Sequence, residues 1–189
     1  MKLHPINVGN FKLDGGAMFG VVPKALWNKT NPADEKNMID IASRCLLIED
    51  GARLILIDTG MGTKQSDKFF SFYYRWGNLS VEKALASVGF CKEDVTDVFL
   101  THLHFDHCGG CVDWNKDRSG YELVFKNAVI WSNDKHWSWA AKANSREKAS
   151  FLSENILPIK ESGNLKFIPV PSLEILQSCE LGFDVFFAN

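Results

Sequence analysis

Short apolar runs, each bounded by polar or turn-forming residues, recur along the chain and predict β-strands. They are rich in Val, Ile, Leu and Phe, too short for helices, and without helical spacing. Asp50-Gly51 separates two of the runs, and an acidic residue followed by glycine in that place predicts a hairpin. The predicted strands are Phe11–Leu13, Ser43–Glu49, Arg53–Asp58, Val98–Thr101, Ala128–Ser132, Leu165–Val170 and Phe183–Ala188.

Helical spacing or capping residues mark three segments between the strands. The predicted helices are Val81–Val88 with Ser80 as cap and Gly89 as end, a segment capped by Asp134 that reaches about Asn144, and Arg146–Asn155, which is expected to end before Pro158. Strands come first and then alternate with helices. This order predicts an α/β or α+β layered fold, with residues 1–189 forming one domain.

Composition and charge narrow the classes of protein. The chain has 189 residues, 46% of them hydrophobic, with a formal net charge of −2. These values fit a globular domain, and the absence of a basic field argues against a nucleic-acid partner. The five cysteines are odd in number and scattered, which does not suggest a disulfide framework. With no secretory signal and no apolar run long enough for a membrane span, we expect a soluble cytoplasmic protein.

One short stretch, THLHFDHCGG at 101–110, concentrates metal-binding side chains. His102 and His104 follow a predicted strand at spacing i, i+2, which places both on one face. Asp106 and His107 follow in a turn that the next two glycines permit. Imidazole and carboxylate ligands suit zinc, and they also suit iron or manganese. The stretch therefore predicts a metal site whose metal the ligand types leave open.

With Ile57-Asp58-Thr59-Gly60, this stretch resembles the metallo-β-lactamase superfamily of metal-dependent hydrolases. The resemblance implies a four-layer αββα sandwich with two divalent metal ions at its edge, zinc being the first expectation. It implies that His102 and His104 bind metal one, that Asp106 and His107 bind metal two, and that Asp58 supports the loop from behind. The segment 14–27 resembles the lactonase-like and organophosphate-hydrolase-like branches.

The chain departs from the family pattern after His107. A complete two-metal site in the family takes a third His, a bridging Asp and a last His from later loops. His136 is the single later histidine, and beside Trp137 it is expected to be a surface or helix-end residue. The later aspartates Asp113, Asp117, Asp134 and Asp184 do not sit in a Gly-His-like loop. We therefore expect the fold to lack its C-terminal part, with the natural protein extending past Asn189.

These observations predict a metal-dependent hydrolase in which Asp106 is catalytic, holding the second metal and orienting the attacking hydroxide. The expected substrate is a small ester or lactone, such as an acyl-homoserine lactone. An organophosphate or a thioester is the alternative within the fold. A module that binds metal in half a site without turnover is the alternative outside it, and an iron-dependent redox member of the fold is a third. A homodimer stays open.

Two further segments have competing interpretations. Six aromatic residues fall within 66–76, and they predict either core packing or an apolar wall beside the site. Cys108 and Cys111 form a C-x-x-C pattern. Because no thioredoxin-like unit surrounds it, buried packing is favoured over redox function.

Overall fold

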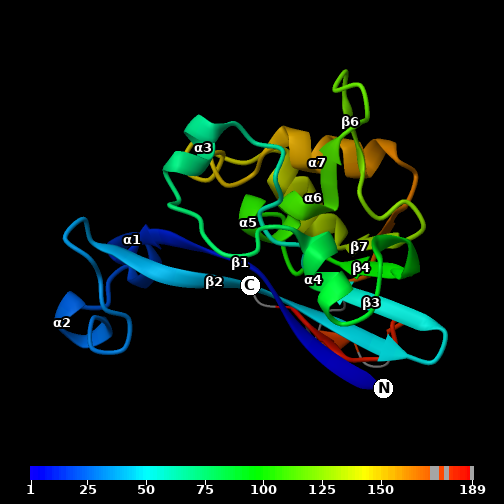
Figure 1. Ribbon diagram of the computed structural model, residues 1–189, viewed down its shortest axis with the longest axis horizontal. Coiled ribbons are helices and arrows are strands. Elements are labelled where there is room, and N and C mark those ends of the chain that lie inside the picture. The colour runs from blue at the N-terminus through cyan, green and yellow to red at the C-terminus, as the bar shows by residue number, and fades with distance from the viewer. Residues whose placement is uncertain (171–174, 177–178, 188–189) are drawn as a thin grey trace.

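A mixed six-stranded sheet forms the centre of the protein (Figure 1). The computed structural model describes residues 1–170, 175–176 and 179–187. The strand order is β1-β2-β3-β4-β7-β8. The first three strands are antiparallel neighbours, and β4, β7 and β8 run parallel to β3. The strands are β1 (Lys2–Asp14), β2 (Met38–Asp50), β3 (Arg53–Ile57), β4 (Asp97–Phe99), β7 (Val129–Ser132) and β8 (Leu165–Phe167).

Two small sheets and several short helices complete the described chain. The first small sheet pairs β5 (Val112–Trp114) with β6 (Tyr121–Leu123), and the second pairs β9 (Ile175–Leu176) with β10 (Val185–Phe186). The helices are α1 (Gly15–Phe19), α2 (Lys24–Trp27), α3 (Asp67–Ser71), α4 (Val81–Ser87), η1 (Lys92–Asp94), α5 (Phe105–Cys108), η2 (Gly109–Cys111), α6 (Asp134–Ala141) and α7 (Ser153–Glu161). Within the described residues, no helix has the length and apolar character needed to cross a membrane.

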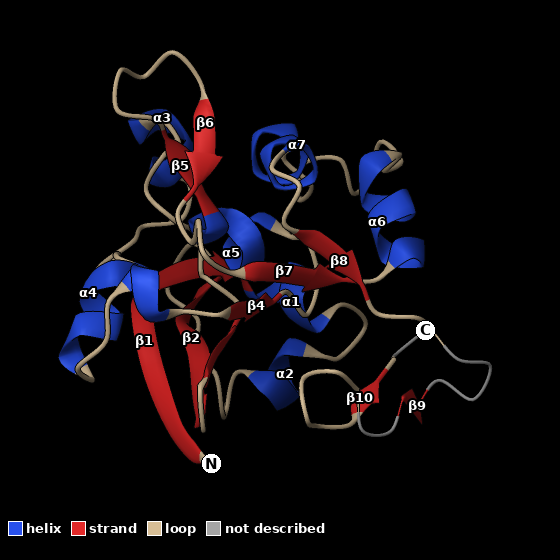
Figure 2. Cartoon of the chain, turned by 90° about the vertical axis from the view of Figure 1, so that its right-hand side faces the viewer, coloured by secondary structure: helices blue, strands red, loops and turns tan. Residues whose placement is uncertain are grey.

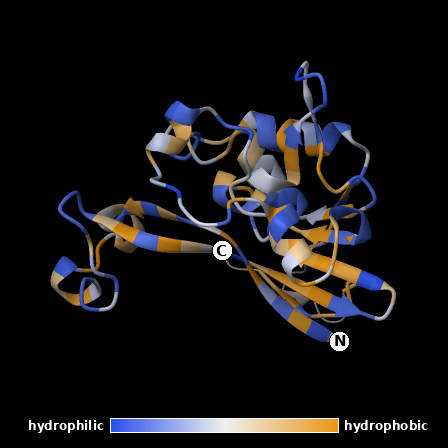
Figure 3. Ribbon diagram, viewed as in Figure 1, coloured by the Kyte–Doolittle hydropathy of each residue, from blue (hydrophilic) through white to orange (hydrophobic). Residues whose placement is uncertain are grey.

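The two faces of the sheet are buried by different parts of the chain. Leu56, Val98 and Ile130 belong to one core that includes side chains of α4, α6 and α7. Ile55 and Trp131 belong to a second core that includes Ile168, Cys179, Leu181 and Val185. This division follows from the alternation of side chains along strands, which is visible as colour stripes on β1 and β2 (Figure 3). Figure 2 shows α6 and α7 on one side of the sheet and β9 and β10 on the other.

Asp97 links three strands of the sheet through its buried carboxylate. Arg53 on β3 donates to both carboxylate oxygens, at 3.2 and 2.8 Å. Trp131 on β7 donates its indole N–H at 2.8 Å, and the Thr96 hydroxyl donates at 2.7 Å. Burial alone would raise the pKa of Asp97, but the hydrogen bonds and the Arg53 charge outweigh it and hold the pKa below its usual value.

The outer edge of β1 is covered by the segment that follows α3. Asn10 N donates to Trp76 O and Trp76 N donates to Asn10 O, both at 2.9 Å. Lys12 N donates to Tyr73 O at 2.7 Å. The register of β1 against β2 shifts between Asn7 and Asn10. The edge strand is therefore bent and then paired over part of its length.

The predicted strands and the Asp50-Gly51 hairpin agree with the sheet, apart from lengths. The predicted strand at 11–13 is the end of a 13-residue strand. Its earlier half contains Pro5 and Gly9, which hide a strand pattern but are tolerated at a sheet edge. The prediction for 183–188 covers β10, and Ala188 lies outside the described residues. The segment 165–170 is a strand over its first three residues.

Two helix predictions were wrong in part. Ser80 caps α4 as predicted, accepting from Lys83 N. The cap of α6 is Asn133 rather than Asp134, because the Asn133 side chain accepts from His136 N. The third helix is Ser153–Glu161 and contains Pro158, whereas residues 145–150 form turns. Ile156 and Ile159 are buried in the core on either side of the proline, and this packing outweighs the one hydrogen bond that proline removes.

Candidate metal centre

The predicted metal-binding side chains meet at the carboxyl end of β4, in residues 101–111, which we call the His-Asp loop. The ring centroids of His102 and His104 are 4.7 Å apart, and those of His102 and His107 are 3.9 Å apart. Asp106 Oδ2 lies 3.5 Å from His107 Nε2. His104 is the N-terminal flank of α5, and this single turn carries Asp106 and His107. Side chains that the sequence placed together are therefore neighbours in space.

Asp58 lies behind this cluster, at the end of β3. Its backbone has φ 58°, a left-handed conformation that Asp tolerates better than most residues. The buried carboxylate accepts from Thr101 N at 2.9 Å and from the Thr101 hydroxyl at 2.8 Å. His107 Nδ1 lies 2.8 Å from the same carboxylate. Because His107 Nδ1 donates to Asp58, His107 Nε2 is left with its lone pair on the side of Asp106.

The main chain of the His-Asp loop is anchored at several successive points. Phe105 N donates to Ser150 O at 3.0 Å. Thr59 donates to His107 O twice, from its main-chain N at 2.8 Å and its hydroxyl at 2.9 Å. Gly110 N donates to Gly60 O at 2.9 Å. The loop is therefore held by hydrogen bonds from other segments rather than by its own single helical turn.

His136 is a further part of this support, and its expected place on the surface was wrong. It lies in the first turn of α6, as a helix-end residue, but its ring is half-buried against the loop. Leu103 N donates to His136 Nε2 at 2.9 Å, and the ring is 6.4 Å from that of His102. The parallel strands β4 and β7 end at the same edge of the sheet. That pairing, which the sequence does not show, brings α6 to the loop.

The electrostatic surroundings differ among the histidines. Burial, followed by the neighbouring His107 and His104, lowers the pKa of His102 to about 4. Burial also lowers the pKa of His104 and of His136. Burial opposes the charged form of His107 as well, but the hydrogen bond to Asp58 and the charge of Asp106 raise its pKa overall. His102 and His104 are thus neutral near pH 7, the form in which imidazole binds metal.

The cluster has the donor types that a metal site requires. Imidazole and carboxylate donors of His102, His104, Asp106 and His107 fit a divalent ion by their chemistry. Over residues 1–170, 175–176 and 179–187, however, no three His, Cys, Asp or Glu side chains form a group that could hold an ion. The four side chains thus have suitable donor atoms for a divalent ion, but a complete coordination sphere would need further ligands.

An aromatic surface adjoins the cluster. Phe69 and Tyr73, from the aromatic segment 66–76, pack against Phe105 with ring centroids 5.3 and 4.9 Å away. We call these three residues the aromatic wall. Burial raises the pKa of Tyr73, and the neighbouring Asp106 carboxylate adds to this shift. The segment therefore combines the two predicted arrangements. Phe69 and Tyr73 pack against Phe105, and this packed surface lies beside Asp106.

The C-x-x-C cysteines belong to the His-Asp loop, and their side chains are buried in the hydrophobic core. Cys108 and Cys111 are completely buried, and burial raises the pKa of both thiols, that of Cys111 to about 12. All five cysteines are unpaired. A buried protonated thiol is a poor nucleophile, so this placement supports the packing interpretation.

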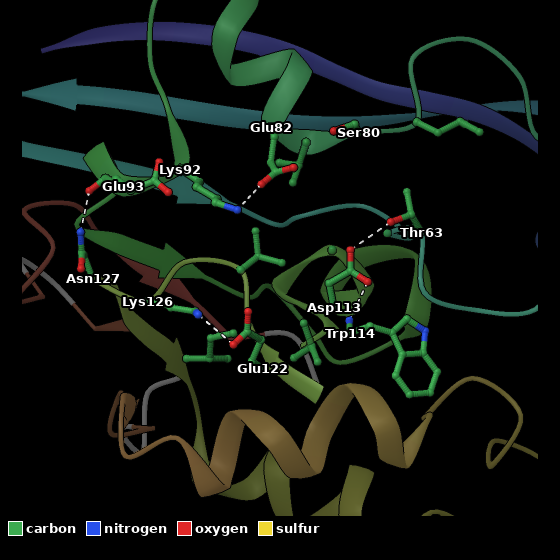
Figure 4. A pocket seen from close by; sticks show the side chains of 17 residues that line it. Thr63, Ser80, Glu82, Lys92, Glu93, Asp113, Trp114, Glu122, Lys126 and Asn127 are labelled. Carbon is green, nitrogen blue, oxygen red and sulfur yellow. Dashed lines mark hydrogen bonds and ion pairs between the residues drawn. The ribbon is translucent and has the colours of Figure 1, made fainter. Parts of the chain in front are cut away.

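A cavity of about 440 Å³ lies behind the loop rather than at the histidines (Figure 4). Gly62, Gly110 and Trp114 are among its lining residues. Figure 4 shows Lys92 paired with Glu82 and Lys126 paired with Glu122 in its wall. None of the four expected metal ligands lines it. The cavity and the metal-binding cluster are therefore separate features.

The chain belongs to the metallo-beta-lactamase superfamily, which it matches over residues 39–175. Its mixed α/β fold, expected from the sequence, is confirmed by solved structures of that fold. A probable metal-dependent hydrolase from Staphylococcus aureus superimposes with a TM-score of 0.81 and 31% identity, covering 97% of this chain and 66% of that one. The dizinc quorum-quenching lactonase AidC has a TM-score of 0.67 and 25% identity, covering 99% and 68% of the two chains.

Curated relatives carry lactonase and hydrolase names. The N-acyl homoserine lactonase AiiB of Agrobacterium fabrum is 27% identical over 139 residues, covering 68% of this chain and 49% of the relative. A probable metallo-hydrolase of Mycobacterium tuberculosis is 32% identical over 115 residues, covering 52% and 36%. The chain thus spans half or less of the length of these relatives.

Proposed function

We propose that the protein is a metal-dependent hydrolase of a small lactone or ester, with an acyl-homoserine lactone as the leading candidate substrate. The observation that carries the proposal is the alignment of Asp58, His107 and Asp106 beside His102 and His104. It supports the proposal because Asp58 orients the His107 ring, whose other nitrogen faces Asp106, in a member of this superfamily. The lactonase relatives support the choice of substrate.

Each residue has a role in this proposal. His102 and His104 bind one divalent ion, zinc before iron or manganese, and Asp106 and His107 bind a second. A bound divalent metal supplies a nucleophilic water near neutral pH and polarises the substrate oxygen. Asp106 would accept a hydrogen bond from that water and so orient it. Asp58 keeps the His107 ring in place, and the aromatic wall contacts the apolar part of the substrate and excludes solvent.

The remaining ligands come from outside the described residues in this proposal, from a longer form of the protein or from a partner chain in a homodimer. The coverage of the relatives supports the first source, since the matched part is 49% of one relative and 36% of the other. The unpaired buried cysteines are in keeping with a reducing compartment such as the cytoplasm.

A second candidate function is a metal-binding module without turnover. The observation that favours it is that fewer than three ligands gather around one point within the part of the chain that the structure describes. An organophosphate or thioester hydrolase remains the alternative among enzymes, because the same donors serve those reactions.

Metal stoichiometry and lactone hydrolysis test the proposal on the purified full-length natural protein. Elemental analysis after exhaustive buffer exchange should give close to two ions, and D106A should lower kcat by about a hundredfold or more. The exposed Asp117 offers a matched control, D117A, which should behave as wild type. One ion or fewer without turnover would favour the module, and normal turnover by D106A would refute the role of Asp106.

A further inference from the structure

Lys64 is buried behind the His-Asp loop, in the segment that follows β3. The residue is 6% exposed. Its Nζ donates to the carbonyl oxygen of Gly109 at 2.6 Å and to that of Val112 at 3.0 Å. Both acceptors belong to the main chain at the two ends of η2, so one ammonium bridges this turn from its beginning to its end.

Keeping a cation at this position is costly. Moving an ammonium out of water is costly, and hydrogen bonds to carbonyl oxygens offset only part of that cost. Burial accordingly lowers the pKa of Lys64. A methionine would fill a similar volume without this cost. The buried amine therefore indicates a task that an apolar side chain cannot perform, which is to hold two carbonyl groups.

The held turn adjoins the two ligands of the second metal. Gly109 flanks the C-terminal end of α5, two residues after His107. An isolated single turn such as α5 does not keep its own direction, so it depends on contacts at its ends. Thr59 holds the main chain of α5 at His107, and Asp58 holds the His107 ring. Lys64 holds the main chain just after α5, at Gly109.

We propose that Lys64 is a positioning residue: by clamping the carbonyls of Gly109 and Val112, it sets the direction in which Asp106 and His107 present their donor atoms. The proposal rests on the proposed metal-binding role of those two residues. Lys64 does not touch the metal or the substrate in this arrangement. Its effect passes through the backbone of α5 and η2.

Hydrogen exchange in the metal-free protein tests the clamp itself. K64M removes the charge and the donors while keeping the length, and K142M changes an exposed lysine as the matched control. We expect K64M to speed exchange of loop amides such as Phe105 N and Gly110 N about tenfold, with the β3 amides unchanged. Unchanged loop exchange, or equal acceleration in β3, would overturn the proposal. If K64M does not fold, K64L, which also lacks a donor, replaces it with the same deciding outcomes.

Cobalt binding tests the consequence for the ligands. We expect K64M to weaken Co²⁺ binding by about tenfold or more and to shift the visible absorption band of the bound ion. L85A, which removes a buried side chain of α4, is the control for lost stability and should keep the wild-type band. The same affinity and band in K64M as in wild type, or equal losses in K64M and L85A, would overturn the positioning role. Absence of Co²⁺ binding in wild type would count against the proposed function instead, and the exchange comparison would still decide on the clamp.

Discussion

His107 and Asp58 are joined side chain to side chain, with His107 Nδ1 2.8 Å from Asp58 Oδ2, although 49 positions separate them. The same carboxylate accepts from the main chain and the hydroxyl of Thr101. One buried carboxylate therefore orients the histidine near the end of the His-Asp loop and secures the backbone at its beginning. A carboxylate that holds a metal-binding imidazole in this way fixes both its tautomer and its direction.

Replacing Asp58 should weaken metal binding and the fold together. In D58N the amide cannot accept all the hydrogen bonds that the carboxylate accepts from Thr101 and His107. We expect Zn²⁺ affinity to fall about 10–100-fold and the free energy of unfolding to fall by about 1–3 kcal/mol. Competition with a chelator and urea unfolding measure these two quantities. D117N, in an exposed turn, should change neither; equal Zn²⁺ affinities for D58N and D117N would contradict the role of Asp58.

His136 should contribute to stability through one hydrogen bond. H136L leaves the amide of Leu103, which lies between His102 and His104, without its acceptor. An unsatisfied buried donor costs about 1–3 kcal/mol, so the midpoint of urea unfolding should fall correspondingly. K135L changes the exposed neighbour on the same helix and serves as the control. A midpoint in H136L equal to that in K135L would show that the bond contributes nothing.

Gly110 should not tolerate a side chain. A Cβ added there would overlap the carbonyl oxygen of Thr59, which is backbone and cannot turn away. We expect G110A to lower the free energy of unfolding by more than about 2 kcal/mol through overpacking. Gly120 is the matched control, because a Cβ at that position would meet only ordinary contact with Asn115. Thermal unfolding of G110A and G120A measures the difference, and equal stabilities would disprove the close approach of Gly110 to Thr59.

The Asp97 carboxylate should make stability depend on pH. Its pKa is depressed in the folded state, so its contribution is full above the unfolded pKa of about 3.9 and is lost as the pH falls through the folded pKa. At pH 7 we expect D97N to be less stable than wild type by about 2 kcal/mol. At pH 3, below the unfolded pKa, the gap should narrow, because the unfolded chain binds a proton at Asp97 more readily than the folded protein does. Urea unfolding at pH 7 and pH 3 measures the difference in unfolding free energy between wild type and D97N. A difference that is the same at both pH values would exclude this linkage.

Local sequence patterns predicted those parts of the site that are local in the chain. His102, His104, Asp106 and His107 lie within six positions, so their meeting needs only a strand and a turn. The hairpin at Asp50-Gly51 is local in the same sense, and Gly51 adopts φ 60° in it. The role of Asp58 came from the family resemblance and stays a prediction; the structure shows its contact with His107.

Features that depend on tertiary packing could not be predicted in this way. His136 reaches the loop because β4 and β7 pair in parallel, and no pattern around His136 reports that pairing. Lys64 is one of 21 lysines and arginines, and its burial is a property of the assembled loops. Helix propensity alone predicts that a helix ends before Pro158, and the burial of Ile156 and Ile159, which overrides that propensity, cannot be read from the local sequence.

The segment at 73–76 that pairs with β1 has a consequence for association between molecules. A long edge strand offers unpaired main-chain groups to other chains and is a starting point for aggregation. Asn10 and Lys12 are already bonded to Trp76 and Tyr73, so part of that edge is occupied. Tyr73 also belongs to the aromatic wall. Changes that loosen this segment to admit larger substrates would therefore uncover the edge of β1 and lower the solubility of the protein.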